Sequence, residues 1–528
     1  MWYKDAVFYE LSVRAFKDSN GDGNGDLRGL IEKLDYLQTL GVDCIWLMPI
    51  YPSPLKDDGY DIADYYNIAE PYGTLEDFKA MIESAHARNI RVITDLILNH
   101  TSDEHPWFKE SRSDRNSPFR DYYVWSDTDK KYEDARIIFV DTESSNWTLD
   151  EKTGQYYWHR FYSSQPDLNY DNPKVQDEMI KVARFWLELG IDGFRADAVP
   201  YLFEREGTNC ENLPETHAYL KKLRSWMDEE YPGRVLLCEA NQWPEDVRKY
   251  FGDGDEFHMG FHFPIMPRIF MAIKKGRADD MVEILSRTPP IPEECQWCTF
   301  LRNHDELTLE MVTPGERQWM WEQYAPEPRM KINLGIRRRL SSLLDHDRRK
   351  IEFANSLLFT LPGSPIIYYG DEIGMGDNLD LPDRNGVRTP MQWDDSPNGG
   401  FTTGRPFTQL VQGELDFHEV NVARQIQNTN SLFHTTRLMI GIRKQHPAFG
   451  RGSMEWLNVN NPAIAAYTRE YLNESLLILN NLENSPQSVL FAKEQPGKYV
   501  NLLSGDHYLM ESGLTLNPYE HLWLKKLT

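Results

Sequence analysis

The stretch LEDFKAMIESAHARNIRVITDLILNH (75–100) contains the unit on which most of the chain is patterned. Residues 75–89 carry apolar side chains at helical spacing, which predicts an amphipathic helix. Residues 90–97 form a short apolar run rich in β-branched side chains, which is typical of a buried strand. A helix that leads directly into a buried strand predicts an α/β fold.

The same pattern recurs through the part of the chain that precedes Asp371. Candidate strands are VFYELSV (7–13), DCIWLMP (43–49), IRVITDLI (90–97), DGFRADAV (192–199), VLLCEA (235–240), FHMGFHF (257–263), CTFLRN (298–303) and PIIYYG (365–370). Amphipathic segments such as LRGLIEKLDYLQTLG (27–41) lie between several of them. Eight strands that alternate with helices predict a parallel (β/α) barrel, with a doubly wound open sheet as the competing arrangement.

Three stretches depart from this pattern. Residues 99–172, rich in Trp, Tyr, Asp and Ser, are far too long for an ordinary crossover and predict an inserted domain over one face of the barrel. Residues 306–350 predict a helical excursion that is a candidate lid. Residues 446–528 show short alternating strands with turn residues, which predict a C-terminal β-sandwich domain. The catalytic barrel is then expected to comprise residues 1–98 and 173–445.

Composition narrows the class of partner. The 528 residues include 57 Lys+Arg and 82 Asp+Glu, so the net charge of −25 argues against a nucleic-acid or anionic-membrane partner. Five cysteines, an odd number, do not suggest a disulfide framework and point to a reducing compartment. Charged residues interrupt residues 1–16, so we find no signal-peptide core there. We expect a cytoplasmic protein that acts on a small molecule, and homo-oligomer formation is left open.

Polar residues gather at the ends of four predicted strands. They are Asn99 and His100, Arg195 and Asp197, Glu239, and His304 and Asp305. In a parallel barrel the carboxyl ends of the strands meet on one face, where active sites lie. A single acid at a strand end is as readily a helix N-cap as a catalytic group, but the coordinated set predicts an active site.

These segments resemble the four sequence regions of the α-amylase superfamily, glycoside hydrolase family 13. The resemblance is carried by VFYELSVRAFKDSNGDGNGDLRGL, DLILNHTSDEHPWF, GFRADAVPYLFEREGT, CEANQWPEDV, FLRNHDELTLEMV, INLGIRRRL and RTPMQWDDS, which occur in the order of the family between residues 7 and 396. It implies a (β/α)8 TIM barrel with an inserted domain after strand 3 and a C-terminal antiparallel β domain. It also implies an enzyme that acts on α-glucosides.

The resemblance assigns roles to the carboxyl groups. Cleavage of an acetal passes through an oxocarbenium-like state, which calls for two carboxyl groups beside the scissile bond. Asp197 is implied as the nucleophile, Glu239 as the general acid/base and Asp305 as the acid that stabilises the transition state. Arg195, two residues before Asp197 on the same strand face, would hold the nucleophile ionised. Glu239 must stay protonated near neutrality, which calls for an apolar setting or neighbouring negative charge.

Five further positions are implied as substrate-binding. His100 and His304 resemble hydroxyl-binding histidines. Asp61, in GYDIADY, matches the acid that holds the non-reducing glucose, and Arg388, in RTPMQW, resembles its ion-pair partner. Gln165 resembles another sugar-binding position. For Gln165 and Arg388 an ordinary loop role is the alternative.

A calcium loop is predicted near the amino terminus. The residues Asp18, Asn20, Asp22, Asn24 and Asp26 place oxygen ligands at the spacing of an EF-hand-like loop, with glycine at its sixth position. Oxygen-only ligands in a flexible loop favour Ca²⁺ over Mg²⁺. The twelfth position is Gly29 where an EF-hand has Glu, and a turn rich in Asp, Asn and Gly is the alternative.

A second structural Ca²⁺ site is implied by the resemblance alone. Its ligands would be the side chains of Asn99, Asp167 and Glu204, together with the carbonyl oxygens of Tyr201 and Leu202. Such a site would join the inserted domain to the barrel. No organic cofactor is expected.

Within the superfamily the chain closely resembles members that interconvert maltose and trehalose. The implied reaction is a retaining intramolecular glucosyl transfer through a covalent β-glucosyl-Asp intermediate, with minor hydrolysis to glucose. The competing hypothesis is an α-glucosidase or oligo-1,6-glucosidase that hydrolyses short α-glucosides with the same residues. A non-catalytic barrel is disfavoured because Asp197, Glu239 and Asp305 are all present.

Overall fold

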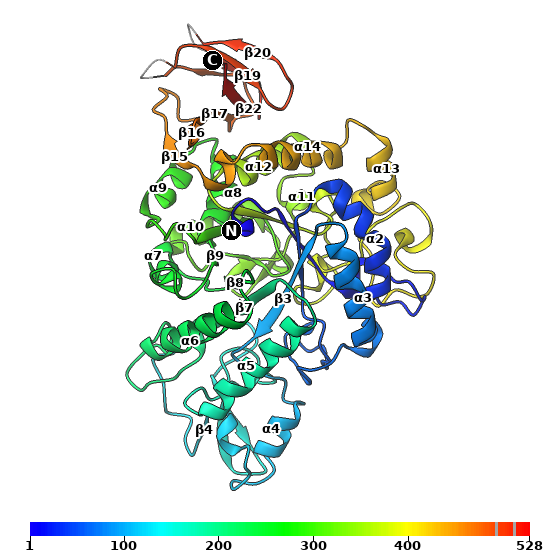
Figure 1. The fold of residues 1–528 in the computed structure, drawn as a ribbon, viewed down its shortest axis with the longest axis vertical. Helices are drawn as coiled ribbons and strands as arrows, with labels where there is room; N and C mark the ends of the chain where they lie inside the picture. Colours follow the sequence, from blue (N-terminus) through cyan, green and yellow to red (C-terminus); the bar gives the residue numbers. More distant parts are fainter. Residues whose placement is uncertain (492–494, 511–513, 528) are drawn as a thin grey trace.

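The computed structural model, which describes residues 1–491, 495–510 and 514–527, contains a closed barrel of parallel strands (Figure 1). In order around the barrel the strands are β1 (Phe8–Leu11), β14 (Ser364–Tyr368), β10 (Gln296–Phe300), β9 (Met259–Phe261), β8 (Val235–Cys238), β7 (Gly193–Asp197), β3 (Arg91–Ile97) and β2 (Cys44–Leu47). Each overlaps one predicted strand. Phe8 of β1 pairs with Cys44 of β2 and with Ile366 of β14, so the sheet is closed and the open-sheet alternative is wrong.

Helices cover the outside of the barrel, as α2, α3, α5 and α6 do in Figure 1. The helices are α1 (Val13–Phe16), α2 (Leu27–Leu40), α3 (Leu75–His86), α4 (Pro106–Ser111), α5 (Pro173–Glu188), α6 (Pro214–Glu230), α7 (Pro244–Val247), α8 (Ile265–Lys275), α9 (Asp279–Arg287), α10 (Pro314–Tyr324), α11 (Leu340–Leu343), α12 (Arg348–Thr360), α13 (Val422–Gln427), α14 (Leu432–Gln445) and α15 (Ala448–Arg451). Local chemistry explains their ends. Thr74 and Asp77 form a capping box at the start of α3, and Gly41 ends α2 in the left-handed conformation.

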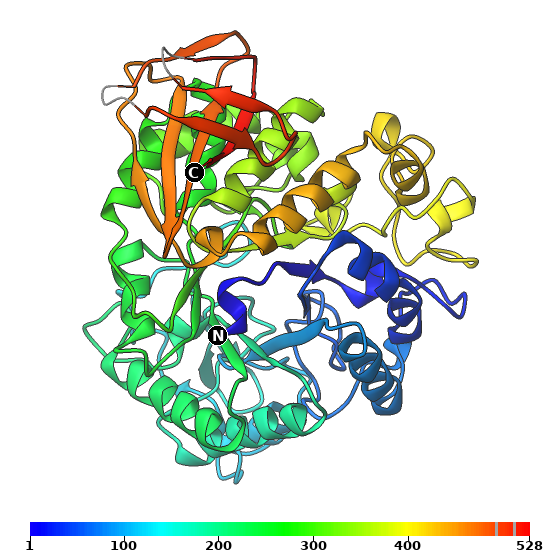
Figure 2. The same cartoon turned by 45° about the horizontal axis from the view of Figure 1, so that its top comes forward.

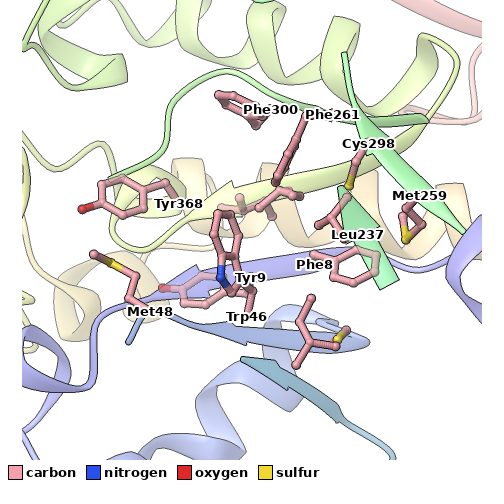
Figure 3. Close-up of a cluster of buried hydrophobic side chains, with 14 of the residues drawn as sticks. Phe8, Tyr9, Trp46, Met48, Leu237, Met259, Phe261, Cys298, Phe300 and Tyr368 are labelled. Carbon is pink, nitrogen blue, oxygen red and sulfur yellow. The ribbon is translucent and has the colours of Figure 1, made fainter. Parts of the chain in front are cut away.

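Large side chains fill the barrel interior. Figure 3 shows Trp46 of β2, Phe261 of β9 and Phe300 of β10 turned toward one another. The Phe261 ring centroid lies 5.7 Å from that of Trp46 and 5.5 Å from that of Phe300, and all three side chains are buried. Burial of one such ring stabilises the fold by about 2–3 kcal/mol. The barrel is therefore a packed core, and the polar groups collect where the strands end.

A small sheet lies in the long segment between β3 and α5. Its strands β4 (Trp125–Ser126), β6 (Gln155–Trp158) and β5 (Trp147–Asp150) are antiparallel. Trp147 and Trp158 pack there against Cys210, which follows β7. The segment 99–172 that was predicted to be inserted thus shares a small apolar cluster with a loop of the barrel.

The segment 306–350 is less helical than predicted. Beside α10 and α11 it contains the short strands β11 (Leu307–Thr308), β12 (Lys331–Ile332) and β13 (Gly335–Ile336), which form a sheet of order β11-β13-β12. The turn between β12 and β13 contains Asn333 at φ 47°, a conformation that asparagine tolerates better than most residues. The segment therefore returns on itself over the barrel face.

The C-terminal part of the chain is an antiparallel β structure. The strands β15 (Ser453–Trp456), β16 (Ile464–Tyr471), β17 (Glu474–Asn481), β22 (His521–Lys526), β19 (Lys498–Asn501) and β20 (His507–Leu509) form one sheet, and β18 (Gln487–Val489) pairs with β21 (Leu514–Leu516). The sheet lies beside α12 and α14 (Figures 1 and 2), and Trp523 Nε1 donates to Ser356 Oγ of α12 at 2.8 Å.

In the described part of the chain no helix has the length and apolar character of a membrane span.

Candidate active site

A pocket of about 860 Å³, counting its open mouth, lies at the carboxyl ends of the barrel strands. Its lining includes the predicted catalytic acids Asp197, Glu239 and Asp305 and both predicted histidines, His100 and His304. The strand ends therefore bring the predicted catalytic residues together on one face.

Arg195 holds two of the three predicted catalytic acids, Asp197 and Glu239. Its Nη1 donates to Asp197 Oδ1 at 2.5 Å, and its Nη2 lies 2.6 Å from Glu239 Oε1. Asp95, its register partner on the neighbouring strand β3, accepts from Nη1 at 2.6 Å. Because the guanidinium is fully buried and its donors have fixed directions, it orients the two acids relative to each other. Sequence reasoning found Arg195 but missed Asp95, which stands four residues before Asn99.

Glu239 has the protonation behaviour of a general acid. Burial raises its pKa to about 7, with Arg195 acting in the opposite direction and Asp197 adding to the rise. The backbone N–H of Ala198 donates to Glu239 Oε2 at 2.9 Å from a left-handed conformation at φ 51°. A non-glycine residue in that region is strained, which is common where a backbone group is aimed at a reacting site.

Asp197 is held in a balance of opposing effects. Burial raises its pKa above the usual range, and the adjacent Arg195 guanidinium lowers it. Arg195 was predicted to keep the nucleophile ionised, and the contact that would do so is present.

The two histidines of the pocket carry different charges. Burial lowers the pKa of His100 to about 4, so this ring is neutral at physiological pH. Burial also acts to lower the pKa of His304, but Asp305 and Glu10 raise it to about 10, so this ring is a cation. Asp305, which pairs with it at 3.1 Å, has a pKa held well below its usual range against the effect of burial. The sequence showed two histidines at strand ends but not this difference.

The acid that faces the pocket after β2 is Asp57 and not the predicted Asp61. Asp61 is fully buried and accepts hydrogen bonds from Ser53 Oγ at 2.9 Å, Lys56 N at 2.9 Å and Asp57 N at 3.1 Å. Asp61 therefore fixes the shape of its loop. The prediction failed because the stretch KDDGYD contains three acids and its letters do not show which side chain turns inward.

Arg384 is the guanidinium that lines the pocket beside Asp57. It donates to Asp57 Oδ1 at 2.6 Å and to Asp305 Oδ1 at 2.7 Å. The predicted Arg388 instead lies behind the lining, where it donates to the His304 carbonyl at 2.8 Å and to Asp305 Oδ1 at 3.1 Å. Arg388 holds a catalytic acid, but it does not form the predicted pair with the acid of the GYD motif.

Gln165 supports the same corner of the pocket. Its side chain is fully buried, and Nε2 donates to Asp57 Oδ2 at 2.9 Å while Oε1 accepts from Tyr162 N. Gln165 was predicted to bind sugar. In the structure it orients the acid that faces the pocket.

Two segments far apart in the chain form the roof of the pocket. Ile138, Phe139 and Phe161 come from the inserted segment, and Thr308 and Glu310 come from the excursion. The predicted inserted domain and the candidate lid therefore both contribute to the pocket lining.

Arg136 ties the two parts of the roof together. Its Nη1 donates to Glu310 Oε2 at 2.6 Å, its Nε to Glu211 Oε1 at 2.8 Å and its Nη2 to the Tyr201 hydroxyl at 3.2 Å. Glu211 is held in turn by Arg160 at 3.0 Å. Because Glu211 and Glu310 lie on different loops, this one guanidinium links the inserted segment, the loop after β7 and the excursion.

The second predicted calcium site has the features that a cation would explain. Three buried oxygen atoms there have no hydrogen-bond partner among the described residues: Asn99 Oδ1, Asp167 Oδ2 and Glu204 Oε1. Burial raises the pKa of Asp167 to about 8 and that of Glu204 well above its usual range. An amide and two carboxyl oxygens are ligands that Ca²⁺ prefers. Tyr201 and Leu202, whose carbonyls were implied as ligands, stand three and two residues before Glu204 in the chain. These residues fit a calcium ion.

The loop from Asp18 to Asp26 offers no such observation. Asp18 accepts from the backbone N–H groups of Asn20, Gly21 and Gly23, and Asp26 caps α2 by accepting from Gly29 N at 2.7 Å. The side chains of Asn20, Asp22 and Asn24 accept hydrogen bonds from their own loop or from Arg14. Among the described residues no cluster of three Asp, Glu, His or Cys side chains forms a metal centre. These hydrogen bonds lie within the loop and its neighbours, and calcium binding there stays a prediction.

Comparison with known families covers almost the whole chain. Residues 11–324 and 336–452 match the family model of the α-amylase catalytic domain. Residues 454–523 match that of the maltogenic amylase C-terminal domain.

The similar proteins include some named trehalose synthase, at higher identity, and some named oligo-1,6-glucosidase, at lower identity. Trehalose synthase/amylase TreS of Mycobacterium tuberculosis is 58% identical over 510 residues, which cover 94% of this chain and 85% of that protein. Trehalose synthase of Pimelobacter sp. is 57% identical over 523 residues, covering 96% and 91%. Oligo-1,6-glucosidase of Bacillus cereus is 33% identical and covers 99% of both chains. Among solved structures, a variant of the trehalulose synthase MutB superposes with a TM-score of 0.82 at 30% identity and covers 100% of both chains.

Proposed function

This chain belongs to the α-amylase family, and with that as the premise we propose that the enzyme interconverts maltose and trehalose by moving one glucosyl group within a closed pocket. Its identity to proteins named trehalose synthase is 54–58% over most of the chain, against 33% to a named oligoglucosidase. The observation that carries the proposal is the Arg136 network, which joins both roof segments above the catalytic acids. Transfer without loss of glucose requires a roof that keeps the released glucose in place and water out.

The first step cleaves the disaccharide. Asp197 attacks the anomeric carbon of the non-reducing glucose of maltose, and a C–O bond to Asp197 forms as the glycosidic C–O bond breaks. Glu239 donates its proton to the departing oxygen, so the second glucose leaves as a neutral molecule. The pKa of Glu239 near 7 allows it to donate this proton at neutral pH.

The second step rejoins the two sugars differently. The released glucose stays in the pocket, turns and presents its anomeric hydroxyl to the glucosyl-Asp197 ester. Glu239, now a carboxylate, removes the hydroxyl proton as the new C–O bond forms and the ester bond breaks. Two inversions at the same carbon retain its α configuration, and the product is α,α-trehalose.

Residues around the acids hold the transferred glucose. Asp57 and Arg384, paired at 2.6 Å, form a charged wall that can accept from and donate to sugar hydroxyls. Asp305 lies 2.7 Å from Arg384 and is ionised, so it can bind hydroxyls that become more acidic as positive charge develops on the ring. His100, a neutral ring, supplies a further hydrogen-bonding group at the pocket wall.

The inserted segment and the barrel are joined by a structural Ca²⁺ in this proposal. Asn99, Asp167 and Glu204 would hold it, with the carbonyls of Tyr201 and Leu202. When bound, the ion would neutralise the buried carboxyl groups of Asp167 and Glu204 and stiffen the loop that leads to Glu211. It takes no part in the chemistry.

Incubation of the enzyme with maltose alone tests the proposal. Trehalose should accumulate as the main product, with glucose as a minor product that forms when water reaches the glucosyl ester. The alternative is hydrolysis of short α-glucosides by the same carboxyl groups. Glucose without trehalose, resolved by anion-exchange chromatography over the full time course, would establish that alternative and refute the proposal.

A further inference from the structure

Glu10 is a buried carboxyl group beside the active site that has no assigned role. It lies on β1, where its register partners are Trp46 of β2 and Tyr368 of β14, and its side chain has no exposed surface. Its Oε1 is 2.5 Å from His304 Nδ1, and its Oε2 has no hydrogen-bond partner in the structure. The short contact of this carboxyl group is therefore with His304, a histidine that lines the pocket.

His304 is held by a carboxyl group on each ring nitrogen. Nδ1 faces Glu10, and Nε2 lies 3.1 Å from Asp305 Oδ2. A neutral imidazole has only one N–H, so one carboxylate would then face a nitrogen lone pair; the imidazolium donates to both. The ring also stacks on Tyr60 at a centroid distance of 5.1 Å and an interplanar angle of 13°.

We propose that Glu10 is a positioning residue that keeps His304 doubly protonated. The fixed cation then holds Asp305 ionised and oriented toward the sugar, and its ring supports the stacked Tyr60 ring. The inference rests on the proposed function for its substrate, a glucosyl group bound at the pocket. Glu10 does not line the pocket, so it acts on the sugar through His304 and not by direct contact.

The charged groups around His304 agree with this role. They are Glu10 from β1, Asp95 from β3, and Asp305, Arg384 and Arg388 from the loops after β10 and β14. The neutral Tyr60, from the loop after β2, stacks on the ring, and Arg195 of β7 lies over Tyr60. Burial alone would favour the neutral ring, but Asp305 and Glu10 raise the pKa of His304 to about 10. Two anions contact the ring directly. Arg388 donates to the backbone carbonyl of His304 and to Asp305, and Arg384 donates to Asp305 and Asp57, so neither guanidinium is paired with the imidazole ring.

The test substitutes Glu10→Gln, which keeps the size and the acceptor oxygen and removes the charge. The substrate is α-glucosyl fluoride, because fluoride leaves without a proton and the rate of glucosylation then does not depend on protonation of Glu239. In the parent enzyme kcat/KM should be constant from pH 7 to 9. In E10Q it should fall at least about tenfold between pH 7 and pH 9, which corresponds to a pKa of His304 lowered by about two units or more from its value of about 10 in the parent enzyme.

Nuclear magnetic resonance of histidine labelled with ¹³C and ¹⁵N in the ring supplies a second readout. The signal of His304, assigned by its loss in His304→Gln, should be that of an imidazolium at pH 8 in the parent enzyme and should titrate at lower pH in E10Q. Glu372→Gln is the matched control, because Glu372 is an equally buried carboxyl group that accepts from Tyr9 and Tyr36 and does not contact His304. It should leave both readouts unchanged.

The outcomes separate cleanly. An E10Q enzyme whose activity profile stays constant to pH 9 and whose His304 remains an imidazolium overturns the inference. If E10Q does not fold, the parent spectrum decides, since a neutral His304 at pH 8 is incompatible with the proposed role. Glucosyl fluoride serves an isomerase and a hydrolase equally, so a failure to form trehalose from maltose would refute the proposed function and leave this test intact.

Discussion

The floor and the roof of the active-site pocket are built in different ways. The floor consists of strand ends, where Arg195 of β7 contacts Asp95, Asp197 and Glu239 at 2.5–2.6 Å within one closed sheet. The roof consists of loops from residues 136–161 and 306–310, and it is joined by Arg136. Sheet hydrogen bonds hold the floor, whereas side-chain ion pairs hold the roof.

This difference separates the chemistry from its outcome. In the proposed mechanism the floor forms and breaks the glucosyl ester whatever lies above it, so the same floor would serve a hydrolase and an isomerase equally. Only the roof determines whether the released glucose stays and whether water enters. Substitutions in the floor should therefore change how fast the enzyme works, and substitutions in the roof should change what it makes.

The largest effect is expected from Asp197→Ala. Loss of the nucleophile removes the covalent route, and kcat for maltose should fall by about 10⁴-fold or more. The thermal unfolding midpoint should stay close to that of the parent, because the barrel strands keep their pairing. Substantial trehalose formation by this variant, measured by chromatography, would show that the nucleophile is assigned wrongly.

A smaller loss of rate should follow Asp57→Asn. Removal of the charge from the pair with Arg384 weakens a charge-assisted contact at the sugar, and kcat/KM should fall about 10- to 100-fold. Asp61→Asn is the matched control, since Asp61 holds its loop and does not line the pocket. D61N should lower the unfolding midpoint below that of D57N, whereas its kcat/KM should fall less than that of D57N. The reverse pattern would restore Asp61 as the sugar-binding acid.

In the roof, Arg136→Gln should change the product ratio. Loss of the ion pairs to Glu211 and Glu310 lets the roof segments separate, so the ratio of glucose to trehalose should rise about tenfold while maltose consumption changes less. Arg115→Gln is the control, because this exposed arginine of the same segment donates only to the Thr153 carbonyl and approaches Asp127 at 3.6 Å. An unchanged product ratio in R136Q would show that the Arg136 contacts are not what retains the released glucose.

The smallest effect concerns stability. Removal of divalent cations with a chelator should lower the unfolding midpoint by at least about 5 °C, and added Ca²⁺ should restore it. Asp167→Asn should abolish this response because it removes a ligand of the proposed site. Asp22→Asn, in the amino-terminal loop, should retain it. A midpoint that does not respond to calcium in the parent enzyme would count against the ion.

The floor was largely predictable from the sequence and the roof was not. A strand end carries its side chain to a known face of the barrel, so Asp197, Glu239 and Asp305 were placed by their position in the pattern. Loop residues carry no such constraint. Asp61 was therefore predicted to face the pocket, whereas the structure places Asp57 there. Arg136 gave no local signal, because its partners Glu211 and Glu310 are 75 and 174 residues away. Glu10 was overlooked although it lies in a predicted strand. Its proposed role depends on its contact with His304, which follows a different strand, β10.

Retention of glucose is the central claim, and isotope tracing tests it most directly. Unlabelled maltose is converted in the presence of excess ¹³C-glucose, and the label in the early trehalose product is measured by mass spectrometry. If the released glucose stays under the roof, trehalose should contain almost no label while the free glucose pool is labelled throughout. Trehalose labelled to the same extent as the free glucose would show that the second sugar leaves and returns, and would contradict the closed pocket.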